Sequence, residues 1–377
     1  MFIDWLSCSQ DFDYELPVIS EDGYAHFDYV EGVFGAVRQA RIQHEGSYST
    51  SISVHVRGNS IVMEGNPSRY NRLDNLFGFT TLEDCFAVYN SILTLLGLPN
   101  FTKCTCLGYL DAKDGKAPKP IVNGATIQRL DITTNMTVGG GVCIDAYLKA
   151  LSTMPYRRSR GKLYADGKTV DWKSILGHCR ELYPKVYDKA NDLRIHLLSK
   201  VKRSFGEDSE EYEYVLKLMD YCRALGVTRH ELEIKSPYLI KHNLQFYGLS
   251  DTLNQLINLH NDFLNIDKKL KVSAMDLRTI AHTLIEEGIV DNTKAANITA
   301  LYALNWMHGD TFDSNKTQVQ THRARLRKIG IDILKPCNLL LFSPVIVKKV
   351  IEITRSELQP PDFYKHPQLP NPLRLVA

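Results

Sequence analysis

Residues 129–135, RLDITTN, form a short β-prone segment in which charged and apolar side chains alternate. Successive side chains of a strand point to opposite faces, so Arg129, Asp131 and Thr133 share one face and the apolar residues between them share the other. Aspartate is depleted in strands and is costly to bury without a partner. Asp131 therefore needs Arg129, a hydrogen-bond network or a metal ion beside it, on a sheet with one core face and one charged face.

The same alternation returns in residues 227–235, VTRHELEIK, where Arg229, Glu231 and Glu233 face one way. If the two strands are neighbours in one sheet, Asp131 and Glu231 can converge. Two carboxylates on a rigid sheet suit Mg²⁺ or Mn²⁺, which takes one or two carboxylates together with water and phosphate oxygens. The alternative is a set of arginine–carboxylate bridges on a half-exposed sheet. The pattern alone leaves both interpretations open.

The other periodicities indicate strands and helices in alternation. Thr81 and Asp84 form a helix cap before an apolar run to about Leu98. Further segments are predicted as follows: a β-hairpin over 46–64, a basic, turn-rich stretch from 156 to 172, an extended segment around Pro184, two helices over 190–226 broken near Gly206, and mostly helix from 236 to about 330 before a proline-rich tail. The fold class is therefore α+β.

Composition limits the setting and the partners. Lys and Arg number 45 against 43 Asp and Glu, so any nucleic-acid surface must be a local patch. Cys104 and Cys106 lack a second pair at zinc spacing, which favours free thiols in a reducing cytosol. The N-terminus is not a signal peptide, and no segment is apolar enough to span a bilayer. We expect a protein that works inside a cell, without a membrane partner.

Tyr187 stands out among 19 tyrosines because Lys189 follows two residues later, on the same face of an extended segment. A phenol has a pKa near ~10, so a nearby cation or a metal-bound phosphate is needed to make it a nucleophile. The alternative is an ordinary tyrosine that fills the core. The spacing permits catalysis without requiring it.

Several distinctive segments, in order, resemble the gene II/gene X replication initiators of filamentous phages, most closely the RstA group of the cholera-toxin phages. The matching segments are FIDWLS near the start, EGNPSRYNRLDNLFG at 64–78, RLDITTN, TVDW at 169–172, VYDKANDL at 186–193, RHELEIKSPYL at 229–239 and the PPDFY…NPLRLVA ending. The resemblance implies a central antiparallel sheet, related to that of rolling-circle replication nucleases, in a domain over residues 1–240. A mostly helical DNA-binding or accessory region would follow over residues 241–377.

The resemblance also implies an activity. Such a protein nicks one strand of the double-stranded phage origin through a 5′-phosphotyrosine intermediate, starts rolling-circle replication, and later cuts and rejoins the displaced single strand. It would be a metal-dependent endonuclease and strand-joining transesterase in the host cell cytoplasm, working with a host helicase and polymerase. The alternatives are a non-catalytic DNA-binding regulator on the same scaffold, or a structural protein with a salt-bridged sheet.

By the same resemblance, the tyrosine of the family's Tyr-x-Lys segment matches Tyr187, with Lys189 beside it and Tyr183 as a nearby competitor. Arg129 and Asp131 match its Arg-x-Asp strand. The family's Arg-Phe-Glu strand matches Arg229 and Glu231, with His230 in place of the aromatic residue. The H-x-H pair of many rolling-circle enzymes is missing, so the implied Mg²⁺ or Mn²⁺ site rests on carboxylates.

Two basic segments are candidates for binding DNA phosphates. The first, YRRSRGK at 156–162, and the second, HRARLRK at 322–328, contribute these side chains: Arg157, Arg158, Arg160, Lys162, Arg323, Arg325 and Arg327. A solvated charged face is the alternative for both.

Overall fold

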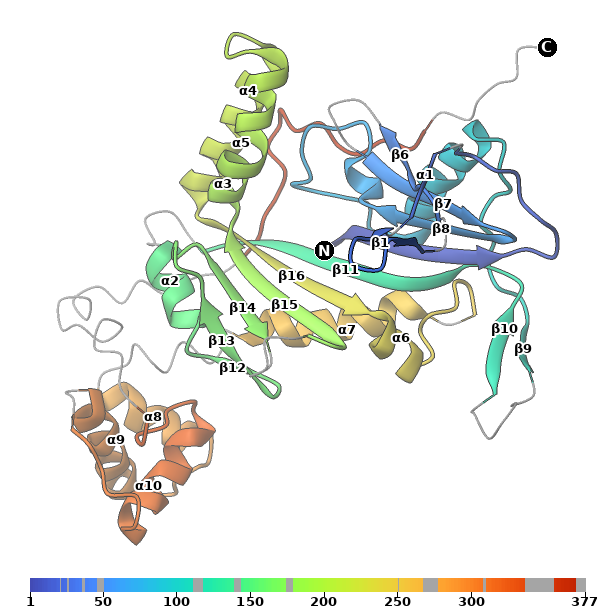
Figure 1. The fold of residues 1–377 in the computed structure, drawn as a ribbon. Helices are drawn as coiled ribbons and strands as arrows, with labels where there is room; N and C mark the ends of the chain where they lie inside the picture. Colours follow the sequence, from blue (N-terminus) through green and yellow to red (C-terminus); the bar gives the residue numbers. More distant parts are fainter. Residues whose placement is uncertain are drawn as a thin grey trace.

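The computed structural model describes residues 1–20, 22–25, 27–35, 38–45, 51–110, 118–138, 144–173, 179–249, 251–266, 277–307, 310–335 and 356–370. Its main feature is one large antiparallel sheet (Figure 1), whose strands run in the order β12-β13-β14-β15-β16-β11-β1-β8-β7-β6, with β17 paired to β11. The α+β class predicted from the sequence is confirmed.

The sheet strands are short at the edges and long at the centre. Their bounds are β1 Phe2–Asp11, β6 Ile42–Glu45, β7 Ser51–Arg57, β8 Ser60–Gly65, β11 Thr126–Thr137, β12 Pro155–Tyr156, β13 Ser159–Leu163, β14 Thr169–Lys173, β15 Leu182–Asp188, β16 Val227–Lys235 and β17 Ser356–Glu357. The two strands that the sequence singles out, β11 and β16, are central and adjacent. The predicted hairpin is β7–β8, with Gly58 at a positive φ in its turn.

Helices cover the apolar face of the sheet and one of its ends. The helices outside the C-terminal unit are α1 Leu82–Leu95, α2 Ile144–Leu151, α3 Lys189–Asp192, a π turn Leu193–Leu198, α4 Ser199–Phe205, α5 Glu210–Leu225, α6 Ser236–Lys241 and α7 Thr252–Leu264. α1 begins as predicted, because the Thr81 side chain accepts from the amide of Asp84, and it ends three residues before the expected Leu98. Gly206, at φ 90, separates α4 from α5.

The main core joins the sheet to helices from both halves of the chain. Leu130, Ile132 and Leu232 of the central strands pack with residues of α1, α2 and α7. Phe263 of α7 contacts the Trp172 ring edge-on, with 5.5 Å between the ring centroids. The core of the sheet therefore extends past residue 240 and includes α7.

A second core cluster lies beside α5. It joins α3, α5 and the start of β16 to Leu358 and Tyr364 of the C-terminal segment. That segment returns to the sheet, where β17 pairs with Met136 and Thr137. The last described residues are thus part of the sheet region.

Three helices form a unit with a core of its own: α8 Leu277–Glu286, α9 Thr293–Met307 and α10 Thr317–Lys328. In Figure 1 this unit stands apart from the sheet. The helical region predicted after the sheet is thus divided, since α6 and α7 pack on the sheet and α8–α10 pack on one another.

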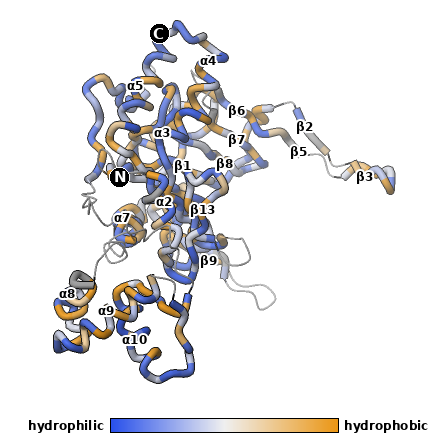
Figure 2. Tube along the Cα trace, turned by 90° about the vertical axis from the view of Figure 1, so that its left-hand side faces the viewer, coloured by the Kyte–Doolittle hydropathy of each residue, from blue (hydrophilic) through white to orange (hydrophobic). Residues whose placement is uncertain are grey.

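Three smaller strand pairs leave the body as ribbons: β2 Gly23–Tyr24 with β5 Arg38–Gln39, β3 Phe27–Asp28 with β4 Val33–Phe34, and β9 Leu107–Leu110 with β10 Lys119–Val122. Figure 2 shows the β2–β5 ribbon and β3 reaching away from the sheet. The stretch 156–172, expected to be rich in turns, instead forms most of β12, β13 and β14 at one edge of the sheet. Residues 336–355, an apolar stretch between the helical unit and the tail that the sequence predicts as a strand or helix, lie outside the described residues.

Candidate active site

The charged face of the sheet is assembled by strand register. On β16, Glu233 lies opposite Asp131 of β11, and Glu231 lies opposite Thr133. On the other side of β16, Tyr183 lies opposite Glu233, Lys185 opposite Glu231 and Tyr187 opposite Arg229. Side chains directly opposite one another share a face of a sheet. Asp131 and Glu231 therefore face the same way from adjacent strands, as their spacing predicts.

Arg129 binds the two carboxylates nearest to it. Its Nε lies 2.9 Å and its Nη2 2.6 Å from the Asp131 oxygens, and its Nη2 also lies 3.1 Å from Glu233. Burial raises the pKa of Asp131 to about 7, while the hydrogen bond from Arg129 lowers it and the charge of Glu231 adds to the rise. The guanidinium also lies over the Trp5 ring, 5.3 Å from its centroid. The arginine–carboxylate bridges of the alternative interpretation are thus present here.

Glu231 joins the candidate nucleophile to a lysine. The Tyr187 hydroxyl donates to Oε2 of Glu231 at 3.2 Å, and Lys185 Nζ lies 2.6 Å from Oε1. Burial raises the pKa of Tyr187 well above its ordinary value; Glu231 raises it further and Arg229 lowers it. The phenol is therefore protonated at neutral pH and already donates to the carboxylate that could accept its proton.

Tyr183, the competing tyrosine, faces the same way in a different setting. Its hydroxyl donates to Asp171 at 2.8 Å, and the ring lies 5.0 Å from Lys173 Nζ and 5.1 Å from Lys185 Nζ. Tyr164 donates to the same oxygen of Asp171 at 2.9 Å. Tyr183 is thus bonded to Asp171 on β14, whereas Tyr187 is bonded to Glu231 on β16, the strand next to that of Asp131.

Lys189 is not where strand alternation puts it. β15 ends at Asp188, whose side chain accepts from the amide of Asn191 and caps α3, so Lys189 is the first residue of a helix. Its buried Nζ donates to Asp192 at 2.7 Å and to Asn75 at 3.0 Å. The prediction that Lys189 stands beside the phenol on one strand face is wrong, because the capping aspartate turns the chain out of the strand.

A buried network surrounds Arg229, the cross-strand partner of Tyr187. Arg229 is 0 % exposed, donates to Asn135 Oδ1 at 2.9 Å, and lies 3.4 Å from Asp4. Asn75 donates to the same aspartate at 2.9 Å. Burial lowers the pKa of Arg229, but the carboxylate of Asp4, together with Tyr187 once it ionises, raises this pKa by more. Arg229 therefore pairs with Asp4, and not with Glu231 as its Arg-x-Glu spacing suggests.

The donor set suits a hard divalent ion only in part. Within the described residues, no three His, Cys, Asp or Glu side chains form a group that could hold a metal ion. A carboxylate pair such as Asp131 and Glu231 is still the kind of protein contribution that Mg²⁺ needs when substrate phosphates and water supply the other oxygens. The residues fit such an ion by donor type. The ion would share the Asp131 carboxylate with Arg129 and the Glu231 carboxylate with Lys185.

The basic hairpin, residues 156–162, continues the charged face. Arg160 lies opposite Lys173 and Lys162 lies opposite Asp171, so both share the face that carries Tyr187. Arg157, Arg158, Arg160 and Lys162 are exposed, and none of them forms an ion pair with a described residue. Positive charge that no described carboxylate neutralises thus lies at the sheet edge nearest to the tyrosine strand.

The second basic segment has another arrangement. Arg323 of α10 makes two bonds to Asp332, at 2.7 and 3.1 Å, and Arg325 donates to the Thr299 hydroxyl at 3.4 Å. Arg327 and Lys328 are exposed. Two of the three arginines predicted to bind DNA are therefore engaged within their own helical unit.

Comparison with known proteins agrees with this arrangement. Residues 3–262 match the family model for the N-terminal part of the gene II replication-associated protein, and residues 284–370 match the model for its C-terminal part. The chain belongs to this replication-associated protein family. Among curated proteins, the replication-associated protein of Escherichia phage If1 is 48% identical over 316 residues, which cover 84% of this chain and 98% of the relative.

Family membership confirms the resemblance to the gene II replication proteins, while the closer likeness to the RstA group stays a prediction. The first match ends within α7, on the sheet core, and the second begins within α8, in the helical unit, and continues through the C-terminal segment that returns to the sheet. Among the described residues, no helix has the length and apolar character needed to cross a bilayer.

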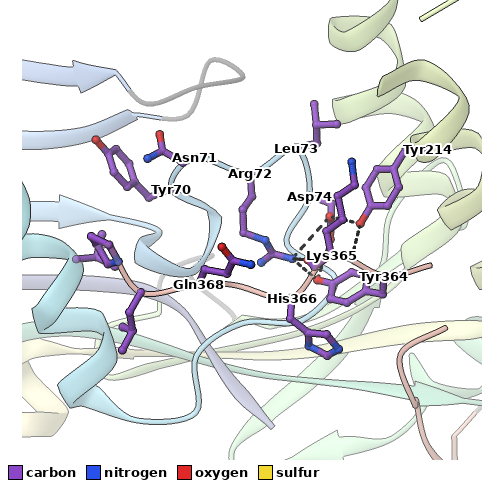
Figure 3. A pocket seen from close by; sticks show the side chains of 13 residues that line it. Tyr70, Asn71, Arg72, Leu73, Asp74, Tyr214, Tyr364, Lys365, His366 and Gln368 are labelled. Carbon is purple, nitrogen blue, oxygen red and sulfur yellow. Dashed lines mark hydrogen bonds and ion pairs between the residues drawn. The ribbon is translucent and has the colours of Figure 1, made fainter. Parts of the chain in front are cut away.

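A cavity of about 630 Å³ lies next to the buried network of this replication-associated protein. Figure 3 shows Arg72 between Asp74 and Tyr364, with Lys365 and His366 along the C-terminal segment. Asp74 accepts from the hydroxyls of Tyr214 and Tyr364, each at 3.0 Å. These bonds fix the C-terminal segment to the loop that carries Asn75.

The sequence did not assign a role to three residues of the site: Glu233, Lys185 and Asp4. Alternation already puts Glu233 on the face of Glu231, and the same rule applied to β15 puts Lys185 between the two tyrosines. Both could have been predicted from the alternation of side chains along a strand. Asp4 could not, because nothing local to FIDWLS connects it to Arg229.

Proposed function

We propose that this chain nicks one strand of the double-stranded phage origin through Tyr187, starts rolling-circle replication, and rejoins the displaced strand. The observation that carries the proposal is the Tyr187 hydroxyl bonded to Glu231 on the face that also holds Asp131. That face extends to the exposed Arg160 and Lys162 of the basic hairpin. A nucleophile, an acceptor for its proton and a phosphate-attracting edge thus share one surface.

The chemistry follows from these contacts. The Tyr187 oxygen attacks the scissile phosphorus while its proton passes to Glu231 Oε2, to which it already donates. The bond from phosphorus to the 3′ oxygen breaks, and that oxygen takes a proton from solvent to become a free 3′-hydroxyl. The 5′ phosphate stays on the tyrosine as a phosphodiester. Because that bond keeps the energy of the broken one, a later 3′-hydroxyl can attack it and rejoin the strand without ATP.

Mg²⁺ or Mn²⁺ is proposed as the cofactor, held by Asp131 and Glu231, and it would withdraw charge from the phosphate oxygens as the new bond forms. Arg129 keeps Asp131 in place through its two bonds. Lys185 orients Glu231 from the other side. Lys189 contributes from the buried network, through Asn75 and Asp192, and not from a position beside the phenol.

The proposed partners follow from the reaction. The protein binds the double-stranded origin and then the displaced single strand, and it hands the 3′ end to a host polymerase while a host helicase opens the duplex. These steps belong to the host cytoplasm. A non-catalytic regulator on the same scaffold is the second candidate, because Arg129 already bridges Asp131 and Glu233 as a structural ion pair would.

The deciding experiment is to map the covalent adduct. With origin DNA and Mg²⁺, we expect the DNA-linked peptide to contain Tyr187. Tyr187→Phe should fold, bind DNA and form no adduct, because it lacks only the attacking oxygen. Tyr183→Phe tests the competitor, and Tyr221→Phe is a matched control on α5, since its hydroxyl donates to the Gln359 carbonyl. A link at Tyr183 would overturn the choice of residue, and no adduct with any variant would favour the regulator.

Metal removal tests the cofactor separately. Chelation should stop nicking, and Asp131→Asn should abolish Mg²⁺-dependent nicking while the helical content stays unchanged, since the amide cannot replace a carboxylate ligand. Asp220→Asn is the control, because this exposed aspartate of α5 pairs with Arg223 and contacts neither Arg129 nor Glu231. Nicking that survives both chelation and Asp131→Asn would remove the metal from the proposal.

A further inference from the structure

Arg229 is the residue that the sheet register places opposite the candidate nucleophile. β15 and β16 pair so that Tyr187 lies directly across from Arg229, while Lys185 pairs with Glu231 one position along. The side chain of Arg229 is fully buried, in contrast to those of Arg129 and Lys185, which are 35% and 22% exposed. Of these three cations, Arg229 is therefore the best shielded from solvent.

Arg229 is also held from several parts of the chain. Asn135 of β11 accepts from its Nε, and the backbone carbonyls of Asn75 and Leu76 accept from its Nη2. Asp4 of β1 lies 3.4 Å from Nη1. Of these four partners, Asp4 alone is charged, and its distance is long for a tight ion pair. The positive charge is thus fixed in position without being fully cancelled by a carboxylate.

Lys189 stabilises the loop residue that holds Arg229. Its Nζ donates to Asn75 Oδ1, and Asn75 in turn donates to Asp4 and gives its carbonyl to Arg229. The lysine that follows the tyrosine in sequence therefore acts on the loop that fixes Arg229. The match of Lys189 to the Tyr-x-Lys segment then has a physical meaning that differs from a direct contact with the phenol.

We propose that Arg229 is a positioning residue for strand cleavage: it holds a fixed positive charge opposite Tyr187 and stabilises the negative charge that develops on the tyrosine oxygen during attack. This rests on the proposed role of Tyr187 as nucleophile. A preorganised charge in a site shielded from water stabilises developing charge more than an exposed one does, because no solvent has to reorganise. Arg229 acts through Tyr187, so the proposal needs no contact between the guanidinium and DNA.

The test compares Arg229→Lys with Arg229→Gln, of which only lysine keeps the charge. Both lose the branched hydrogen bonds, so a purely structural arginine predicts equal damage. If charge matters, the single-turnover rate of adduct formation should fall on the order of 10²-fold further in Arg229→Gln than in Arg229→Lys. The affinity for origin DNA should be the same in the two variants. Equal rates in two folded variants would overturn the proposal.

A second variant keeps the proposal testable if both substitutions prevent folding. Asp4→Asn removes the ion pair and leaves the guanidinium in place, so the adduct rate should stay equal or rise. A large fall in that rate, with unchanged fold and DNA binding, would show that the ion pair itself is required and would overturn the inference. Mapping the adduct keeps the two claims apart: a link at another tyrosine refutes the proposed nucleophile, whereas a Tyr187 link with no effect of charge refutes only the role of Arg229.

Discussion

The basic hairpin, residues 156–162, and the basic end of α10, residues 322–328, carry the same signature in sequence but differ in how much of their charge is free. The hairpin's four cations are exposed: Arg160 and Lys162 lie on a strand that continues the face of Tyr187, and Arg157 and Arg158 lie in the turn before it. On α10, Asp332 binds Arg323 and Thr299 engages Arg325. A run of cations therefore predicts a DNA surface only when the fold provides no carboxylate for them.

The largest expected effect is on the hairpin. Neutralising Arg157, Arg158, Arg160 and Lys162 together to Gln should weaken binding by about 10²–10³-fold near physiological salt, because each lost phosphate contact lowers the salt slope by about 0.9. Fluorescence anisotropy at several salt concentrations measures both quantities. Origin and unrelated duplexes should lose affinity alike, and a loss confined to the origin would show base readout instead.

A control of equal charge comes from α4 and α5. The substitutions are to Gln at Lys200, Lys202, Arg203 and Lys217, of which Lys202 and Lys217 form ion pairs with Glu207 and Glu213. The salt slope should change little. A slope that falls equally in both sets would mean that net charge, and not the position of the hairpin, governs binding.

Acid should affect the stability of both regions, since each contains a buried, neutral histidine that contacts a threonine hydroxyl. In the sheet region His260 Nε2 lies 2.9 Å from the Thr134 hydroxyl, and burial lowers its pKa to about 3. In the helical unit His322 Nδ1 lies 2.9 Å from the Thr299 hydroxyl, and burial with Arg325 lowers its pKa too. Both histidines remain neutral in the fold at a pH where they would be protonated in the unfolded chain.

The sign follows from proton uptake. Below the ordinary pKa of 6.5 the unfolded chain binds a proton that folded His260 refuses, so the contribution of His260 to stability falls as the pH drops from 6.5 to about 3. At about 1.4 kcal/mol per pKa unit, the loss amounts to a few kcal/mol. Asp131 acts in the opposite sense: burial raises its pKa to about 7, so the fold takes up this proton before the unfolded chain does and gains stability as the pH drops from 7 to 3.8. His260→Gln removes only the destabilising contribution, so hydrogen exchange should show the sheet region of this variant gaining protection, relative to the parent chain, as the pH falls toward about 4. The same pH dependence of protection in His260→Gln and in the parent chain would contradict the role of His260.

The alternation of side chains along a strand accounts for the part of the site that could be predicted from the sequence. Alternation at period two sets Arg129 and Asp131 on one face and Glu231 on the matching face of its strand, and the antiparallel register brings the strands together. The same rule failed at Lys189, because it assumes that a strand continues. Asp188 is a good helix cap, and a cap signal inside an extended segment could have ended the strand there.

The buried network lay beyond sequence reasoning for a different reason. Arg229 meets Asp4 and Asn75, which come from segments far away in the chain, and no local pattern specifies which distant polar groups converge. Likewise, no spacing in HRARLRK reveals that Asp332 neutralises Arg323. Availability of charge is a property of tertiary structure, whereas the presence of charge is a property of sequence.

The smallest expected effect comes from α10 itself, where two arginines one turn apart should behave differently. Arg327→Gln removes an exposed cation without an ion pair in the described structure, so affinity should fall about fivefold at physiological salt, as one phosphate contact predicts. Arg323→Gln should leave affinity and salt slope almost unchanged, because Asp332 already neutralises that guanidinium. It should instead lower the melting temperature of the helical unit, since Asp332 loses the partner that lowers its pKa. Fluorescence anisotropy measures the DNA affinity of the two variants, and thermal unfolding of the full chain measures their melting temperatures. Equal losses of affinity would mean that DNA displaces Asp332, and the distinction between free and neutralised charge would then fail for this helix.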